Sequence, residues 1–258
     1  ALDDPSLVTS TTEKALAAEP LAKLAYLRRV LGRGKVPGAA AWVKMMLDRK
    51  EPVVVFGMFS DVLDTLEAAL ARLTIPFVRL DGTLSRQQRQ AAIDAFTKGD
   101  VNVFLCSMAG REGITLHRGD VLAKHPELKG HLIQPANLLF LERWYTPAAE
   151  EQAEDRIRRI GQKRPTTIWQ LHAADTIDDR INELVEAKRQ IVKDVIGAAE
   201  IEHIEHDKIL NVWRKMPELQ KGVPSVAANP KAVLSLPSLP PLDQLHAVYF
   251  DTRTWPIP

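Results

Sequence analysis

Two arginines in the second half of the chain have the type and spacing to bind a polyphosphate. Residues 152–162 read Gln-Ala-Glu-Asp-Arg-Ile-Arg-Arg-Ile-Gly-Gln. As a helix, this stretch puts Gln152, Arg156 and Arg159 on one face, and Gly161 stands where a C-cap glycine would end it. Planar guanidiniums held one turn apart bind phosphate oxygens in a fixed geometry. A solvated basic helix end explains the same residues and stays open as the alternative.

The composition is that of a globular protein with a sizeable core. The 258 residues are 45% hydrophobic and 26% charged, with a net charge of +1. Any nucleic-acid contact must therefore come from a local patch. The single cysteine, Cys106, excludes an internal disulfide framework and is expected to be a buried, inert thiol. No signal peptide and no apolar run of about 20 residues is apparent, so we expect no membrane partner.

Strand and helix signals alternate after a helical start. Residues 1–50 are predicted to form helices, broken at Gly32-Arg33-Gly34. Ser85 and Gln88 form a capping-box signature for a later helix, and Thr176 is predicted to cap a long one. The expected strands are Val53–Phe56, Phe77–Leu80, Val101–Cys106, Leu138–Leu141 and Thr166–Leu171. Such alternation predicts an α/β fold with a parallel sheet and helices on both faces.

The loop after the strand Val101–Cys106 is a candidate ligand loop. It lies at the carboxyl end of a parallel strand, where open α/β sheets bind ligands. Ser107 can donate to a phosphate, and Gly110 and Gly113 would let backbone N–H groups approach it. Glycines that only shape a turn are the alternative.

Several motifs resemble the second helicase lobe of the Snf-type (Swi/Snf-like) ATPases, which are DNA translocases of helicase superfamily two. The string from Gln152 to Gln162 is similar to their last motif, with Arg158 where the family usually has His. The lead-in before Pro52 resembles the annealing-helicase-like branch. The other matching segments, in family order, are Val53–Ser60, Arg79–Thr83 with Arg89, Leu105–Leu116 and Thr176–Asp179. The resemblance covers roughly residues 20–197 and implies a RecA-like, P-loop NTPase-like second lobe.

The resemblance also implies roles for individual residues. Arg156 and Arg159 would be arginine fingers, which reach the γ-phosphate of an ATP held, with Mg²⁺, mainly by a first lobe. The residues implied to face ATP are Gln152, Glu112 and Gly113. The residues implied to contact DNA are Phe59, Ser60, Ser107, Ala109, Arg111, Trp144 and Tyr145.

Two segments depart from the family pattern. Residues 121–136 are inserted before the fourth expected strand, and we expect a surface loop over the cleft, with simple decoration as the alternative. Trp144-Tyr145-Thr146-Pro147 stands where the family has Trp-Asn-Pro, which places Tyr145 at the family's tryptophan. That aromatic would stack against DNA or brace the end of the strand. An ordinary core or surface aromatic remains open for Trp144 and Tyr145.

Three other segments are assigned no chemistry. Gly32-Arg33-Gly34-Lys35 lacks the spacing of a phosphate loop. The residues from Glu202 to Asp207 contain acidic and His side chains but have no partner cluster, so we expect a solvated helix face and no metal site. Residues 217–258 hold eight of the 17 prolines, which predicts an extended tail without its own core. Apolar tail residues that would attach it to the lobe or to a partner are Val248, Tyr249, Phe250 and Trp255.

The chain is thus expected to be the second lobe of an ATP-dependent double-stranded DNA translocase. Its expected parts are a helical lead-in (1–50), the RecA-like lobe (51–200) and a helical, then Pro-rich extension (201–258). No phosphate loop and no Asp-Glu pair occurs, so the chain alone is expected to be inactive and to need a first RecA-like lobe, upstream or on a partner chain. We expect a cytoplasmic, nucleoid-associated or nuclear location. A non-catalytic RecA-like module that binds DNA or protein is the alternative, and a strand-separating helicase is a third possibility.

Overall fold

A six-stranded sheet organises the computed structural model, which describes residues 5–107, 114–124, 132–159, 161–194 and 248–255. The strand order is β2-β3-β1-β4-β5-β6. The strands are β1 (Val53–Gly57), β2 (Val78–Leu80), β3 (Val103–Ser107), β4 (Asn137–Phe140), β5 (Thr166–Ala173) and β6 (Val248–Trp255). The helices are α1 (Pro5–Asp48), α2 (Ser60–Arg72), α3 (Arg86–Lys98), α4 (Gly119–Lys124), α5 (Pro147–Glu154) and α6 (Ile177–Asp194).

The central strands are buried on both faces, as their apolar, β-branched sequences predict. Every residue of β1 and β3 is buried, and β1 pairs in parallel with both β3 and β4. The α/β prediction is confirmed, and all five predicted strands are present, with ends that shift by one or two residues. The capping box predicted for α3 is also formed, with Ser85 as its N-cap and Gln88 as its partner.

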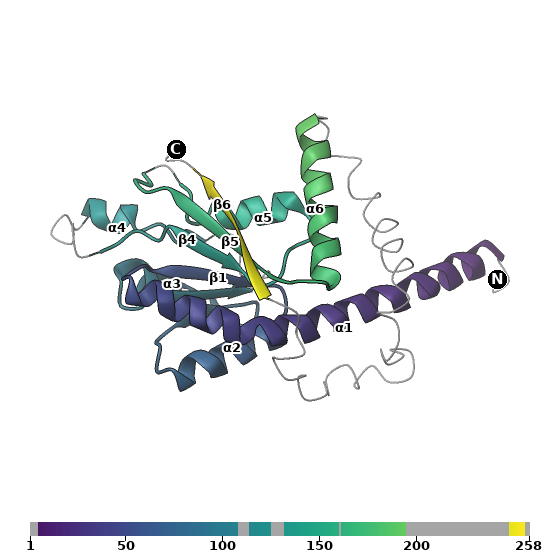
Figure 1. Ribbon diagram of the computed structural model, residues 1–258, viewed down its shortest axis with the longest axis horizontal. Coiled ribbons are helices and arrows are strands. Elements are labelled where there is room, and N and C mark those ends of the chain that lie inside the picture. Colours follow the sequence, from purple (N-terminus) through teal and green to yellow (C-terminus); the bar gives the residue numbers. More distant parts are fainter. Residues whose placement is uncertain (1–4, 108–113, 125–131, 160, 195–247, 256–258) are drawn as a thin grey trace.

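Helices cover both faces of the sheet (Figure 1). On one face α1 and α2 pack on β1 and β3, through Trp42, Val43 and Leu66. On the other face the core includes Phe96 of α3 and Ala153 of α5. In the described part of the chain, no helix is long and apolar enough to cross a membrane.

The sixth strand adds an antiparallel edge to the predicted parallel sheet and comes from the tail that was expected to be extended. β6 runs antiparallel to β5 along its whole length, from Thr166 opposite Trp255 to Ala173 opposite Val248. The ring of Phe250 lies 6.0 Å from that of Trp169 in an edge-to-face arrangement. The tail therefore attaches to the lobe by strand pairing. The sequence had left open whether its apolar residues attach it to the lobe or to a partner.

The lead-in is one helix, and the predicted break at Gly32-Arg33-Gly34 is wrong. Gly32 is instead a packing glycine, because a Cβ there would lie 2.5 Å from Oε1 of Glu142 and 2.8 Å from Cγ2 of Val62. The glycine lets α1 pass close to the end of β4, and this gain offsets the modest cost of a glycine inside a helix. The carboxyl-terminal half of α1 contributes directly to the core of the lobe.

The described ends of the inserted segment lie at the amino ends of the strands. Buried Arg118 donates to the carbonyls of Phe96 and Ile133, at 3.0 and 2.7 Å, and burial lowers its pKa to about 10. α4 lies at the end of the sheet away from α6 (Figure 1). A position over the ligand-binding edge, where Ser107 ends β3, is therefore wrong for these ends, and residues 125–131 lie outside the described residues.

Two buried charged residues, Lys35 of α1 and Glu142 after β4, connect elements of the lobe. Lys35 donates to Asp178 of α6 at 2.7 Å and to the Leu171 carbonyl at 3.0 Å, so it is a structural cation and not part of a phosphate loop. Oε2 of Glu142 accepts the N–H of Met58 at 2.9 Å, which fixes the chain just after β1. Burial raises the pKa of Glu142 to about 7, although Lys35, that N–H and Arg28 favour its charged form.

Replacing Lys35 by Met should destabilise the protein by about 3–5 kcal/mol, because it leaves the carboxylate of Asp178 buried without its cation. The side chains of the pair are only 1% and 8% exposed. Lys44→Met on the same helix is the matched control, since the Lys44–Asp48 pair is 57% and 64% exposed and should contribute under about 0.5 kcal/mol. Urea unfolding measures both variants, and equal losses would refute the assignment.

Glu142 should make stability depend on pH. Its pKa in the folded protein lies above the ordinary value of 4.5, so the folded state holds the proton to higher pH than the unfolded state. The free energy of unfolding should therefore fall as pH rises from about 4.5 to about 7, by roughly 3 kcal/mol. Glu142→Gln should remove this contribution, so that the variant gains stability relative to the parent between pH 5 and pH 8. If the difference in unfolding free energy between Glu142→Gln and the parent protein does not change with pH, Glu142 does not have the raised pKa.

Candidate functional site

The two predicted finger arginines lie on a turn, not on a helix. α5 ends at Glu154, and residues 155–159, which we call the arginine turn, follow it. The N–H of Arg156 donates to the Ala153 carbonyl at 3.1 Å, and the N–H of Ile157 donates to the Glu154 carbonyl at 3.1 Å. These three-residue bonds are tighter than helical ones and bring Ile157 into the core. The predicted helix through Gly161 is therefore wrong.

The arginine turn is joined to the segment that follows the candidate ligand loop. Nη1 of Arg156 donates to the Ile114 carbonyl at 3.2 Å, and the Leu116 N–H donates back to the Arg156 carbonyl at 3.1 Å. Ile114, Leu116 and Ile157 all belong to one buried cluster. The predicted motifs Leu105–Leu116 and Gln152–Gln162 thus meet in space, although about 40 residues separate the bonded partners.

The side chains of the arginine turn differ in how they are held. Arg158 forms an ion pair with Asp155 at 2.9 Å. Arg156 is half-buried, whereas Arg159 is exposed and its Nε lies 3.4 Å from the Asp155 carbonyl. Gln152, one turn earlier on α5, is exposed as well. Arg159 and Gln152 are therefore accessible to a ligand from outside this lobe.

Most of the candidate ligand loop lies outside the described residues. This applies to Ala109, Arg111, Glu112 and Gly113. Ser107 is described: it is the buried last residue of β3, at the carboxyl end of the sheet.

The other predicted DNA contacts gather at the same edge. Phe59 and Ser60 follow β1, and Tyr145 follows β4, the neighbour of β1 in the sheet. The guanidinium of Arg28 lies 4.5 Å from the ring centre of Tyr145 and 5.7 Å from that of Phe59. Arg28 also donates to the carbonyl of Arg143. Both rings therefore contact α1, which favours bracing over DNA stacking for Tyr145, whereas Ser60 is exposed.

Trp144 is a core residue. It is fully buried, and its ring meets those of Phe56 and Phe140 edge-to-face at 5.7 and 5.5 Å. This is the core alternative left open by the sequence, and it leaves no face of Trp144 for stacking on a base.

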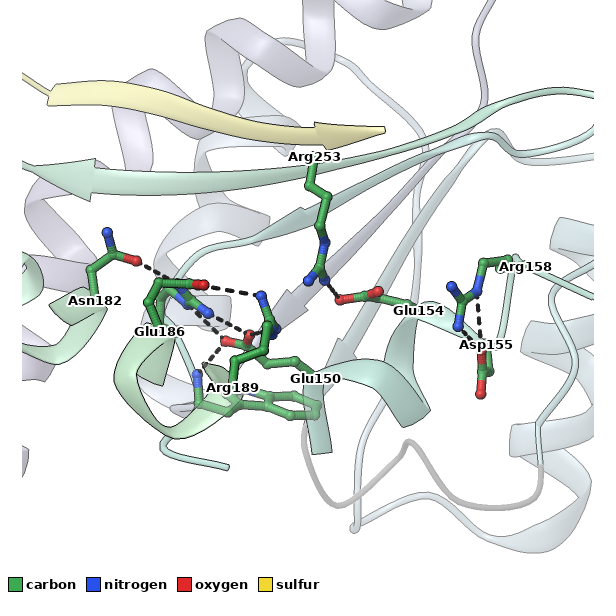
Figure 2. Close-up of polar contacts among 10 residues, drawn as sticks. Glu150, Glu154, Asp155, Arg158, Asn182, Glu186, Arg189 and Arg253 are labelled. Carbon is green, nitrogen blue, oxygen red and sulfur yellow. Dashed lines mark hydrogen bonds and ion pairs between the residues drawn. The ribbon is translucent and has the colours of Figure 1, made fainter. Parts of the chain in front are cut away.

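A network of charges around α5 was missed from the sequence. Glu150 is fully buried and accepts from Arg143 at 2.8 Å and from Arg189 of α6 at 3.1 Å, and both cations also bond to Glu186 (Figure 2). Burial opposes the charge of Arg143, but its bonds to Glu150 and Glu186 raise its pKa overall. A Glu inside the apolar face of α5 was the available signal, and its partners come from distant elements.

The described donor set of the site suits phosphate. Among the described residues, no group of three or more His, Cys, Asp or Glu side chains could hold a metal. Arg156 and Arg159 offer guanidinium N–H donors, which match phosphate oxygens.

Comparisons with known proteins agree with this geometry. Residues 38–161 match the family described as the helicase conserved C-terminal domain. "Helicase-like transcription factor CHR27" of Arabidopsis thaliana is 34% identical over 146 residues, 56% of this chain and 12% of that protein. "ATP-dependent helicase FUN30" of Saccharomyces cerevisiae is 31% identical over 158 residues, 60% of this chain and 13% of that protein. The chain thus spans less than a fifth of the length of these relatives.

A solved structure, described as the C-terminal part of the Fun30 ATPase domain, has a similar fold. It superposes with a TM-score of 0.54 at 27% identity, over 71% of this chain and 54% of that one. Residues 38–161 are therefore a helicase conserved C-terminal domain with a RecA-like fold, and the relatives of the chain are Snf-type ATP-dependent helicases.

Proposed function

We propose that the chain is the C-terminal lobe of an ATP-dependent translocase on double-stranded DNA, and that its arginine turn acts on ATP held mainly by a first lobe. The observation that carries the proposal is the reciprocal pair of hydrogen bonds between Arg156 and the 114–116 segment. It fixes the turn against the core while Arg159 stays exposed. An arginine that reaches from this lobe to ATP on the first lobe needs both properties.

The chemistry required of this chain is electrostatic. ATP with Mg²⁺ supplies the phosphoryl group and most of its own charge neutralisation when bound. Arg156 and Arg159 would donate to phosphate oxygens and stabilise charge that develops during transfer, and Gln152 is accessible on the same side. The metal would be held by the first lobe, because the described part of this chain has no carboxylate cluster for it.

DNA would bind at the carboxyl-end edge of the sheet. Ser60, which follows β1 at the start of α2, is its exposed described member, and Ser107 ends β3, the strand directly beside β1. Contacts to phosphates carry affinity without reading sequence, which is what movement along a duplex requires. A protein that moves along duplex DNA would be located where the cell keeps its DNA.

Replacing Arg159 by Ala in the chain joined to a first lobe should lower DNA-stimulated ATP hydrolysis by a factor on the order of 10³, with DNA affinity unchanged. Arg158→Ala is the matched control, because it lies on the same turn but pairs with Asp155. It should keep most of the turnover. Steady-state hydrolysis with and without duplex DNA measures both variants.

Retained DNA-stimulated turnover in the Arg159→Ala protein would refute the finger assignment. Equal losses in both variants would mean that the turn is only structural. Only a joined parent protein that binds ATP but does not hydrolyse it would favour the alternative, a non-catalytic RecA-like binding module.

Duplex binding by the two-lobe protein should weaken steeply with salt, since each phosphate contact contributes about 0.9 to the slope of log affinity against log salt. Ser60→Asp should weaken binding equally on unrelated sequences, because it adds a negative charge at the proposed DNA edge. Thr74→Asp, at an exposed position two residues beyond the opposite end of α2, is the control and should have little effect. Equal effects of the two changes would contradict this placement of DNA.

A further inference from the structure

The carboxyl-terminal strand contacts the helix that carries the arginine turn. Arg253 of β6 forms an ion pair with Glu154, the last residue of α5 (Figure 2). Almost 100 residues separate the two partners in the sequence. The pairing of β6 with β5 makes the contact possible, because it puts Arg253 opposite Ile168, whose side chain belongs to the α5 face of the sheet.

Because side chains alternate along β6, its two faces contact different parts of the lobe. Phe250 lies opposite Leu171, which faces α1, and its ring contacts Trp169. Arg253, three residues later, therefore points to the other face, toward α5. Phe250 attaches the strand and Arg253 brings a charge to the helix end.

Glu154 needs a cation. Its side chain is 0% exposed, and a buried carboxylate without an opposite charge is strongly unfavourable. Glu154 is also the residue that shapes the arginine turn, because its carbonyl accepts the N–H groups of Ile157 and Arg158, at 3.1 and 3.0 Å. A shift of Glu154 would therefore move the backbone on which Arg156 and Arg159 stand.

The geometry points to β6 as a strap that positions the arginine turn through the Arg253–Glu154 ion pair, with Arg253 as a positioning residue. This inference deepens the proposed function, since the turn it concerns is the one that carries the proposed fingers. The strap completes an arrangement in which α5 is held at Glu150 by Arg143 and Arg189, and at Glu154 by Arg253.

Amide hydrogen exchange on the 258-residue chain tests the strap without relying on catalysis. Arg253→Ala should speed exchange at the Ile157 and Arg158 amides about tenfold, because their acceptor belongs to Glu154. Amides of β1 should keep their protection. Arg253→Lys should restore most of the protection at the turn, and Thr254→Ala, an exposed neighbour on the same strand, should change nothing.

A second variant keeps the test decisive if Arg253→Ala folds poorly. Glu154→Gln removes the charge with little change of shape and should give the same local increase in exchange. Unchanged exchange at Ile157 and Arg158 in these variants would overturn the proposal. Equal increases at the turn and in β1 would overturn it too, because β6 would then contribute only to global stability.

Turnover by the two-lobe protein separates the strap from the finger assignment. With both correct, Arg253→Ala should lower kcat about tenfold at unchanged KM for ATP, and should cause no further loss in an Arg159→Ala background. Full turnover of Arg159→Ala together with faster exchange in Arg253→Ala would refute the fingers and support the strap. Lost turnover of Arg159→Ala together with unchanged exchange in Arg253→Ala would support the fingers and refute the strap.

Discussion

The structure of this lobe depends on the two completely buried carboxylates of α5. Glu150 and Glu154 lie one turn apart on a helix of only eight residues, and each must be matched by a cation. The cations come from the β4–α5 connection, from α6 and from β6. Short helices are held by tertiary contacts more than by their own propensity, so α5 is fixed by elements that are remote in sequence.

The same requirement explains why segments outside the central sheet are part of the folded unit. Lys35 of α1 and Asp178 of α6 form a further buried pair, and Arg28 of α1 donates to the connection after β4. The lead-in and α6 thus meet on one side of the connection that leads into α5. The elements that bond to α5 are thus themselves attached to other parts of the lobe.

The buried parts of the sheet were predictable from local sequence, since β1 and β3 are continuous apolar runs and α3 begins with a capping box. β6 was not, because an edge strand carries polar residues on its open side and obtains its hydrogen bonds only from β5. Gly32 misled the prediction of α1, because a packing glycine and a helix break look alike in sequence.

The site was predictable in part. The arginine motif and its exposed Arg159 were found from residue type and spacing, but the helix was predicted to continue through Gly161. The helix instead ends at Glu154, because the tight turns that follow place Ile157 in the core, which is a tertiary effect. The burial of Trp144 and the ion-pair partners of Glu150 likewise depend on distant elements, so local sequence patterns could not predict them.

The most direct test of the account is ATP hydrolysis by this chain alone and by the chain joined to a first helicase lobe, each with and without duplex DNA. We expect no turnover by the chain alone and DNA-stimulated turnover by the joined protein. Turnover by the chain alone, or none by a joined protein that folds and binds ATP, would contradict the claim that this lobe supplies one half of a composite ATPase site.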